Sequence, residues 1–547
     1  MKLRYTAYRR ELYFCGKGTC FMEKLTRRLP IGVQSFESLR QDGYLYVDKT
    51  KYVYELVHAS KQYFLSRPRR FGKSLFLSTL RAYWEGKKEL FEGLDIVELE
   101  KNNSDAWQPY PVFYFDFNRD SFQRSHALED VIEAYLEDWE KIYSCEKEDA
   151  SLAIRFQKLL VRAVEKTGRT VVVLVDEYDK PLLETLETEE LQKQNKDVFK
   201  GFFSTLKSFD AYLRFVFITG VTKFSKVSIF SDLNQLEDIS MDEEYAAVCG
   251  ITEGEMKKAL MPEIDSMAKK HGMDREECLA KLKRTYDGYH FNNEGEGVYN
   301  PFSLLNALKK RQFDSYWFST GTPTFLVNRL IKIGFDVNQF TDRSLYASKS
   351  ELADYRADNP DPVPLLYQTG YLTIIGYDTR LGLCALGFPN NEVQYGLLES
   401  MMPAYVPVSA KRKGKDVVSL DRCIEQGDTD GVQDILTALF ASIPYTSSAD
   451  PFEHYFETVI YLVFTLLGKY TKCEVRSAKG RADCIVETKD FVYIFEFKLD
   501  KSADEALAQI EEKGYAEPYV ADARKVYKIG VNFDSKERNI TEWKVKV

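Results

Sequence analysis

A Gly-Lys-Ser tripeptide at Gly72, Lys73 and Ser74 has the residue types that hold a nucleoside triphosphate. It follows the apolar stretch 62–66 and opens a stretch with helical periodicity, so it lies where a strand passes into a helix. Backbone N–H groups at a helix start bind phosphate oxygens, the lysine reaches the β- and γ-phosphates, and the serine hydroxyl ligates Mg²⁺. The tripeptide predicts a phosphate-binding loop, although alone it also fits an ordinary helix start with a serine near the cap.

The loop departs from the usual GxxxxGK[ST] spacing, because Arg67 occupies the position of the first glycine. The turn must therefore be made differently, and Pro68 is the candidate for making it. Arg69 and Arg70 follow, and two roles fit them equally well: contact with phosphate, or neutralisation of a neighbouring carboxylate.

Two later segments supply side chains for the same site. The apolar stretch 171–175 ends in Asp176 and Glu177. Asp176 is predicted to hold Mg²⁺ through water, and Glu177 to polarise the attacking water. A further strand-like stretch ends in Thr219, followed by Thr222, and either hydroxyl is a candidate for sensing the γ-phosphate. Because ligands collect at the carboxyl ends of parallel strands, these segments favour the nucleotide site over the helix-start interpretation.

The last hundred residues hold a second set of chemically capable side chains. Side chains two positions apart in a strand share a face, so Glu496 and Lys498 point to the same side of the strand VYIFEFK. A turn centred between Lys489 and Asp490 places Asp483 directly opposite Glu496, with Cβ atoms about 5 Å apart. Two carboxylates at that separation repel one another, and a divalent cation that binds carboxylate oxygens offsets the repulsion.

A metal held by Asp483 and Glu496 would make a bound water more acidic, and Lys498 can orient or deprotonate that water. The metal would also stabilise charge on a scissile phosphate, which is the arrangement of a phosphodiesterase. The alternative is an ion-pair cluster on a solvated strand edge. Central strands rarely carry Glu and Lys without a reason, and this strand is apolar enough to be central, so the spacing favours the metal site.

Two α/β units must position these residues. Residues 22–240 alternate short apolar strands with amphipathic stretches, which predicts a largely parallel sheet with helices on both faces. The candidate strands are 62–66, 112–117, 171–175 and 214–219. Residues 250–345 are predicted to be mostly helical, and the stretch to about 440 has no clear pattern. In the last hundred residues we expect helices near 452–467 and 502–514 and strands near 471–475, 482–488, 491–498 and 526–533.

Length and composition exclude several classes of protein. A chain of 547 residues is too long for one core, and 44% hydrophobic and 29% charged residues are typical of soluble globular proteins. No apolar run approaches the ~18–20 residues that span a bilayer, so no membrane association is expected. The nine cysteines are scattered without a CxxC pair, which indicates reduced thiols and a cytoplasmic location. Residues 1–21 lack the apolar core of a signal peptide and are expected to be an extension before Met22, an alternative start.

The segments around the first site resemble the AAA-ATPase-like family of bacterial proteins. The resemblance covers about residues 27–240 and lies in LPIGVQSFESLRQDGYLYVDKTKYVYEL, FLSRPRRFGKSLFLSTL, VVLVDEYDKP and RFVFITGVTKFSKVSIFSDLNQLEDIS. It implies a P-loop ATPase fold of the AAA or STAND kind that uses ATP and Mg²⁺, with the arginine departure shared by the family. It also implies that Asp48, Lys49 and Thr50 lie near the nucleotide. An equally good interpretation is that they cap a helix.

The C-terminal segment resembles the PD-(D/E)xK nuclease superfamily over about residues 450–547, with the two carboxylates and the lysine described above as its motif. Ala482 stands where the motif has proline, a replacement that the superfamily tolerates. The resemblance implies that Glu457, with Glu453 as second choice, is the acidic ligand on the preceding helix. It also implies that Gln509 is the polar residue on the following helix.

Basic residues give only weak support for a nucleic-acid groove. The net charge of −9 does not exclude one, because binding needs only a local basic surface. A basic cluster before the second motif and the run KRKGK fit either phosphate contact or a solvated loop, and the solvated loop is favoured slightly. These residues are Lys472, Arg476, Lys479, Arg481 and residues 411–415.

The sequence therefore predicts a multidomain α/β protein. The predicted parts are an extension (1–21), a P-loop AAA/STAND-like ATPase domain with a parallel sheet (22–245), a mostly helical lid, winged-helix-like and connector region (246–445), and a restriction-endonuclease-like α/β domain (446–547). The predicted function is an ATPase coupled to a Mg²⁺-dependent nuclease that acts on nucleic acid, DNA rather than RNA, in a chain that can form a homo-oligomer. The alternative is a signalling or scaffolding ATPase whose nuclease fold only binds nucleic acid or protein.

Overall fold

The computed structural model describes residues 27–224, 235–318, 324–333, 335, 337–340, 345–355, 361–405, 415–442, 452–468, 472–475 and 483–547. The chain divides into two compact units, the first running to Tyr316 and including Lys349–Thr373, the second formed by Trp317–Ser348 and Ile374–Val547. The predicted domain boundaries stay predictions. No helix in the described ranges is long and apolar enough to cross a membrane.

A five-stranded sheet lies at the centre of the first unit, in the order β2-β3-β4-β1-β5 with parallel pairings. The strands are β1 (Gln62–Ser66), β2 (Val112–Asp116), β3 (Val171–Asp176), β4 (Leu213–Gly220) and β5 (Glu237–Asp238). Each of the four strands predicted from the sequence is present to within one residue at either end. Every residue of β3 is buried, as the apolar sequence of a strand covered on both faces requires.

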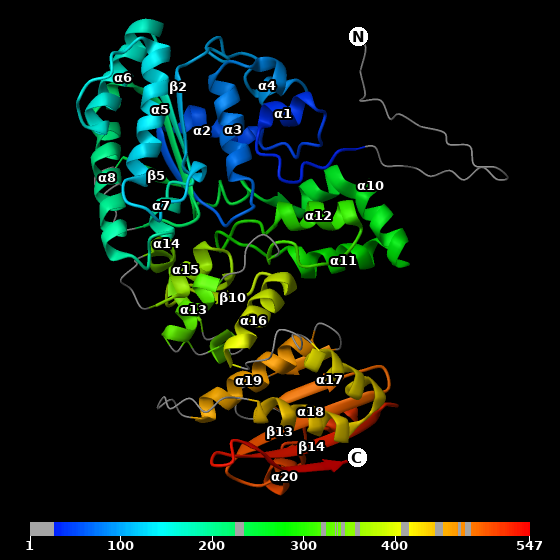
Figure 1. Ribbon diagram of the computed structural model, residues 1–547. Coiled ribbons are helices and arrows are strands. Elements are labelled where there is room, and N and C mark those ends of the chain that lie inside the picture. Colours follow the sequence, from blue (N-terminus) through cyan, green and yellow to red (C-terminus); the bar gives the residue numbers. More distant parts are fainter. Residues whose placement is uncertain are drawn as a thin grey trace, which may run out of the picture. The chain divides into compact units, whose positions relative to one another are not determined.

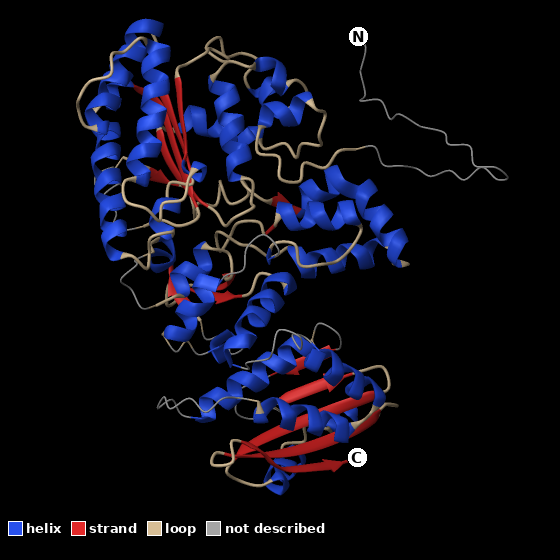
Figure 2. Cartoon of the chain, in the orientation of Figure 1, coloured by secondary structure: helices blue, strands red, loops and turns tan. Residues whose placement is uncertain are grey.

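Helices cover both faces of this sheet (Figures 1 and 2). On one face, the Phe76 ring of α3 (Lys73–Trp84) lies 6.0 Å from the ring of Phe217 on β4. On the other face, the Phe115 ring of β2 contacts aromatic rings of α5 (Ala127–Tyr143), α6 (Leu152–Thr167) and α8 (Glu189–Ser208). Four shorter helices complete this part: α1 (Phe36–Gln41), α2 (Thr50–Ala59), α4 (Asp95–Leu99) and α7 (Lys180–Leu183).

The rest of the first unit is mostly helical, as predicted. Its helices are α10 (Glu253–His271), α11 (Arg275–Tyr286), α12 (Pro301–Lys310), α14 (Lys349–Ala353) and α15 (Val363–Gln368), and its short strands are β6 (Ile251–Thr252) and β7 (Val298–Tyr299). The apolar faces of α10, α11 and α12 share a core that includes Met256, Leu282 and Leu304. A capping box formed by Thr252 and Glu255 fixes the start of α10.

The second unit begins with a three-stranded sheet that the sequence did not predict. Its order is β8-β10-β9, with β8 (Tyr346–Ser348), β9 (Thr373–Asp378) and β10 (Leu383–Gly387). The longest of them, β9, is buried only at its first two residues and contains Gly376, so neither an alternating nor a continuous apolar pattern marks it in the sequence. The helices of this part are α13 (Thr324–Lys332) and α16 (Asn391–Tyr405).

A mixed sheet in the order β11-β12-β13-β14-β15 forms the C-terminal part of the second unit. The strands are β11 (Lys472–Val475), β12 (Cys484–Glu487), β13 (Phe491–Leu499), β14 (Lys525–Asp534) and β15 (Asn539–Lys546). Its helices are α17 (Lys415–Gln426), α18 (Thr429–Ala441), α19 (Phe452–Leu467) and α20 (Ala503–Glu512). Phe464 of α19 packs on Phe495, whereas Ile510 of α20 packs with Ile494, so the two helices lie on opposite faces of β13.

Candidate nucleotide site and candidate nuclease centre

The loop between β1 and α3 has the strand–loop–helix geometry predicted for phosphate binding. Gly72 forms the N-cap of α3 with φ of 96°, a left-handed conformation that favours glycine. Lys73 is buried, and its Nζ donates to the backbone oxygens of Arg67 at 3.0 Å and Pro68 at 3.2 Å. The lysine ammonium therefore lies inside the curve of the loop, where a triphosphate would replace the two carbonyl contacts.

Arg67 holds the loop in place of the missing glycine. Its side chain is buried, and its guanidinium donates to the backbone oxygens of Ser240 at 2.6 Å and Tyr245 at 2.9 Å. The guanidinium also lies 4.1 Å above the ring of Phe291. Burial lowers the pKa of Arg67. Arg67 therefore anchors the start of the loop through contacts with backbone oxygens 173 and 178 residues away in the sequence.

The two following arginines are exposed at the tip of the loop. The Arg70 guanidinium lies 5.2 Å from the Phe302 ring centre, and its backbone has φ of 70°. Arg69 is close enough to Tyr371 to lower the pKa of that phenol, which burial raises. Phosphate contact by Arg69 and Arg70 stays a prediction.

The carboxyl ends of β2 and β3 meet beside α3. Asp116 pairs in register with Asp176, and both side chains point to the α3 face of the sheet. They line a cavity of about 200 Å³. Its other lining residues come from α3, from β2, from the chain after β2 and after β3, and from the segment before α1: Gln34, Ser35, Ser74, Ser78, Arg81, Tyr114, Asn118 and Glu177. Ser74, Asp176 and Glu177 are thus brought together as predicted residues of one site.

Asp176 is 2% exposed, and its Oδ1 has no hydrogen-bond partner in the described part of the chain. Burial raises the pKa of Asp176 to about 6, while a hydrogen bond from the Ser74 side chain and the charge of Lys73 act in the opposite direction. The Tyr114 hydroxyl lies 3.4 Å from Oδ2. Glu177 follows with φ of 50°, which is unusual for a non-glycine residue and typical of functional positions.

The two threonines predicted to sense the γ-phosphate donate their hydroxyls within the protein. Thr219 Oγ1 donates to the Leu65 backbone oxygen at 2.8 Å, across the β1–β4 pair. Thr222 Oγ1 donates to Asp179 Oδ2 at 2.8 Å, and the same carboxylate accepts the backbone N–H groups of Val221 and Thr222. Neither threonine lines the cavity that holds Asp176.

The YVDKT segment caps helices, which is one of the two roles considered for it. Asp48 Oδ1 accepts the backbone N–H of Thr50 at 2.8 Å, and Oδ2 accepts that of Asp95 at the start of α4. The Lys49 ammonium pairs with Glu255 at 2.7 Å and donates to the Ala247 backbone oxygen. These contacts place the charged groups of the segment in structural roles.

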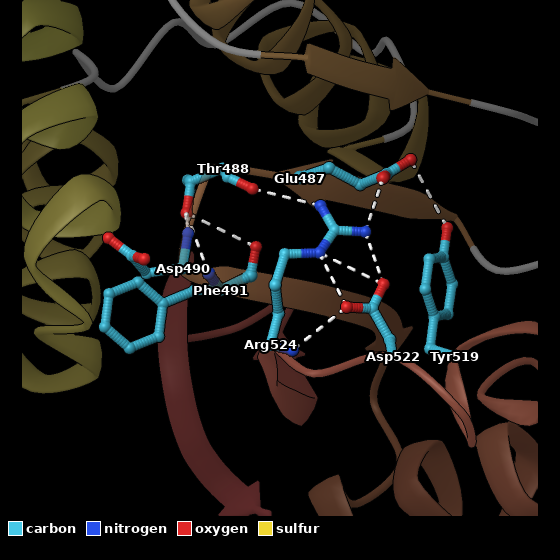
Figure 3. A network of polar contacts seen from close by, with 7 residues as sticks. All are labelled: Glu487, Thr488, Asp490, Phe491, Tyr519, Asp522 and Arg524. Atoms are coloured by element: carbon cyan, nitrogen blue, oxygen red, sulfur yellow. Dashed lines mark hydrogen bonds and ion pairs between the residues drawn. The ribbon is translucent and has the colours of Figure 1, made fainter.

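In the second unit, the β12–β13 hairpin has the predicted register. Cys484 pairs with Phe495 and Glu487 with Val492, so Asp483, one residue before β12, lies opposite Glu496. The hairpin turn is held by a polar network (Figure 3). Its centre is the Arg524 guanidinium, which donates to the backbone oxygen of Thr488 at 3.0 Å and to the carboxylates of Glu487 and Asp522.

The side chains around Glu496 form a short polar chain. Glu496 is 1% exposed, and its Oε1 accepts from Lys498 Nζ at 2.8 Å. The same ammonium donates to Gln509 Oε1 of α20 at 2.7 Å, and Asp483 Oδ2 accepts the backbone N–H of Phe497 at 2.9 Å. Burial raises the pKa of Glu496, and Lys498 partly offsets this. Four predicted residues, Asp483, Glu496, Lys498 and Gln509, thus lie together.

Several predicted residues of this centre lie outside the part that the structure describes. Glu453 and Glu457 belong to the backbone of α19, but their side chains are not among the described ones. The same holds for the side chain of Lys472 and for all of Arg476, Lys479 and Arg481, and for residues 411–414 of the basic run. Among the described side chains, no group of three or more His, Cys, Asp or Glu is arranged to hold a metal ion directly.

The donor sets fit a hydrated divalent cation at each centre. Glu496 Oε2 and Asp176 Oδ1 are both buried, and neither oxygen has a hydrogen-bond partner within the described ranges. Carboxylate oxygens in pairs suit Mg²⁺, which binds proteins through one or two carboxylates and retains water. At the first centre the cavity of about 200 Å³ has room for that water.

Sequence reasoning missed Asp116, Tyr114 and Arg81, which line the first cavity. Arg81 lies two turns after Ser74 on α3, and its guanidinium is 5.5 Å from the Tyr114 ring. A signal was present for Asp116, because it is the acidic residue near the end of the predicted strand 112–117, as Asp176 directly follows the predicted strand 171–175. In the structure the two residues end β2 and β3. Only the sheet order places these two strand ends side by side.

Comparison with known proteins finds two family models and a related protein. A family model described as a predicted AAA-ATPase matches residues 30–230. A model of the PD-(D/E)XK nuclease superfamily matches residues 451–543. A protein of Azotobacter chroococcum mcd 1, described as an uncharacterized protein in the vnfD 5′ region, is 37% identical over 537 residues. The match covers 95% of this chain and 99% of the relative.

Proposed function

The chain belongs to one family with the Azotobacter chroococcum protein and carries a predicted AAA-ATPase domain and a C-terminal PD-(D/E)XK nuclease superfamily domain, and from this premise we propose an ATP-controlled nuclease. In the proposed function, the first unit binds and hydrolyses ATP. The second unit cleaves phosphodiester bonds of nucleic acid, DNA rather than RNA, with a divalent metal. The nucleotide state of the first unit controls cleavage by the second.

One observation supports both halves of this proposal. Asp176 in the first unit and Glu496 in the second are each almost fully buried, and each keeps one carboxylate oxygen without a hydrogen-bond partner in the described structure. An unpaired oxygen of this kind costs free energy unless a ligand completes it. A hydrated Mg²⁺ would complete both, and it would supply neutralisation of phosphate charge and a more acidic water.

In the first unit, the loop would bind the phosphates, and Ser74 with the end of β3 would hold the metal and the attacking water. The N–H groups at the start of α3 would bind the phosphate oxygens, and the Lys73 ammonium would leave its two carbonyl contacts for the β- and γ-phosphates. Ser74 and Asp176 would hold Mg²⁺. Glu177, which lines the same cavity, would orient the attacking water and accept its proton.

In the second unit, Asp483 and Glu496 would hold the metal beside the scissile phosphate. Lys498 is fixed between the carboxylate of Glu496 and the amide oxygen of Gln509, so its ammonium has a defined position. It would orient the attacking water and stabilise negative charge on the phosphate. A lysine suits this position, because its ammonium only donates hydrogen bonds and both neighbouring groups accept them.

The coupling between the two activities has a candidate carrier in the segment 349–373. This segment is part of the first unit, but the chain enters it from and leaves it to the second. A Cβ built on Gly370 would lie 2.8 Å from Pro68 of the phosphate-binding loop. Gln368 Oε1 accepts the backbone N–H of Lys223 at 3.0 Å, next to the turn held by Asp179. The phosphate-binding loop and the turn after β4 therefore both pack against this segment.

The test compares nicking of supercoiled plasmid, cleavage of labelled DNA and RNA, and phosphate release for a set of variants. We expect Asp483→Asn and Lys498→Met to lose cleavage and keep ATP hydrolysis, and Lys73→Ala to lose hydrolysis and the ATP dependence of cleavage. Asp490→Asn, a charge change at the tip of the same hairpin, is the control. Equal cleavage by all variants would show a contaminating nuclease, and binding without cleavage would support the scaffolding alternative.

A further inference from the structure

A second acidic strand end faces the cation side of the nucleotide site. Asp116 ends β2 as Asp176 ends β3, and the two residues pair in register. Both line the cavity of about 200 Å³ with Ser74 and Glu177. Asp176 Oδ1 is buried and has no hydrogen-bond partner in the described ranges, so a ligand in this cavity would supply the partner that it lacks.

We propose that Asp116 is a third acidic group of the nucleotide site and holds, through water, the divalent cation that accompanies the triphosphate. This inference rests on the proposed nucleotide binding and adds to it a residue from a different strand. Asp116 acts as a positioning residue for the hydrated cation, while Ser74 and Asp176 are the groups nearest to it.

The size and charge of the cavity support a hydrated ion. A volume of about 200 Å³ holds several waters at about 30 Å³ each. Mg²⁺ retains several of its waters in protein sites, so acidic groups beyond its direct ligands bind those waters. Among the described residues no group of three or more His, Cys, Asp or Glu is arranged to hold a metal ion, so the proposed contact of Asp116 with the cation runs through water.

The basic residue in the cavity leaves this role open. The Arg81 guanidinium lies 5.5 Å from the Tyr114 ring centre and pairs at 2.6 Å with Glu85, the C-cap residue of α3, which also pairs with Lys87. Its charge is thus already directed to a carboxylate that does not line the cavity. Asp116, Asp176 and Glu177 therefore give the cavity an excess of negative charge that favours a cation.

A purely structural role for Asp116 is the competing explanation. Its Oδ1 accepts the backbone N–H of Asn118 at 2.8 Å and caps the short helix Phe117–Arg119. Asparagine is as good a cap as aspartate, because the side-chain oxygen is retained. Asp116→Asn therefore removes the charge and keeps the cap. Asp120→Asn is the matched control, since Asp120 pairs with the exposed Arg124 and does not line the cavity.

The experiment uses the full chain and two readouts that need no turnover. Binding of Mn²⁺ in the presence of a non-hydrolysable ATP analogue is followed by electron paramagnetic resonance, and binding of a fluorescent ATP analogue is titrated with Mg²⁺. We expect Asp116→Asn to weaken Mn²⁺ binding and raise the half-saturating Mg²⁺ concentration by about 10- to 100-fold. Nucleotide binding without metal should match that of wild type and of Asp120→Asn.

The outcomes separate this inference from the proposed function. If wild type binds the nucleotide and Asp116→Asn shows unchanged metal dependence, Asp116 is only a cap and the inference is wrong while the ATPase proposal stands. If wild type binds no nucleotide, with Lys73→Ala indistinguishable from it, the proposed function fails and the inference fails with it. Asp116→Ala, which removes both cap and charge, reports the stability cost of the cap by thermal unfolding.

Discussion

Asp176 carries a buried negative charge whose compensation the protein leaves incomplete. Its pKa is raised to about 6 from an ordinary value of 3.8, and burial is the main cause. Because each pKa unit corresponds to about 1.4 kcal/mol, the charged form costs on the order of 3 kcal/mol in the metal-free protein. The protonated form avoids this cost, so the site becomes less stable as the pH rises through this range.

Asp176→Asn is therefore expected to stabilise the metal-free protein at neutral pH. With EDTA at pH 7.5, its first unfolding transition should lie several degrees above that of wild type. At pH 5 the difference should shrink, because the folded wild type then holds a proton on Asp176. A variant that unfolds earlier than wild type at pH 7.5 would contradict the buried-charge explanation. The measurement is thermal unfolding followed by calorimetry.

Lys498 compensates the charge of Glu496, so its removal should affect stability as well as chemistry. In Lys498→Met the buried carboxylate loses its cation, at a cost of about 3 kcal/mol at pH 8. The pKa of Glu496, which burial already raises, should rise further, so the destabilisation should decline as the pH falls toward 5. In the double variant with Glu496→Gln, most of the loss should be recovered. Urea unfolding at the two pH values measures this.

At the scale of elements, the nuclease residues depend on a hairpin whose turn is fixed from a distance in sequence. Arg524, immediately before β14, bonds the Thr488 carbonyl and two carboxylates at the turn (Figure 3). The turn that this network contacts joins β12 to β13, the strand that carries Glu496, and Asp483 directly precedes β12. A residue far from the motif in the sequence therefore contacts the hairpin that carries the motif.

Arg524→Ala is expected to destabilise the second unit by about 1–3 kcal/mol, because it leaves the Thr488 carbonyl and the partly buried Glu487 without their donor. Cleavage should fall with the same temperature dependence as unfolding of that unit, while ATP hydrolysis should be unaffected. Lys536→Ala, at an exposed turn between β14 and β15, is the control. An unchanged unfolding midpoint for Arg524→Ala would show that the turn is stable without the contacts of Arg524.

At the scale of the whole molecule, the proposed coupling depends on the side chain of Gln368, which connects a turn of the nucleotide-binding part to helix α14. Gln368 accepts the Lys223 N–H and donates to the Leu352 backbone oxygen at 2.8 Å, so it joins the turn beyond β4 to α14 within the segment 349–373. We expect Gln368→Ala to keep ATP hydrolysis within about twofold of wild type and to lose the ATP dependence of cleavage. Gln312→Ala, at an exposed position, is the control. Cleavage that still responds to ATP would exclude this route.

The amino-acid pattern was enough to predict the strands and the loop that carry both candidate centres. The four parallel strands, the phosphate-binding loop and the Asp483–Glu496 register follow from patterns within a few residues of one another, because alternation and turn length fix which side chains share a face. Matching family models cover both regions. Nucleic-acid preference and oligomeric state stay predictions.

Which groups distant in sequence lie beside these centres could be learned only from the three-dimensional contacts. The pairing of Asp116 with Asp176, the carbonyls that bind Arg67 and the role of Arg524 depend on sheet order and on contacts between segments up to about 180 residues apart. The acceptors of the Thr219 and Thr222 hydroxyls, the Leu65 backbone oxygen and the Asp179 carboxylate, also lie on other segments of the chain. Local periodicity carries no information about such contacts, because they arise from packing of whole elements against one another.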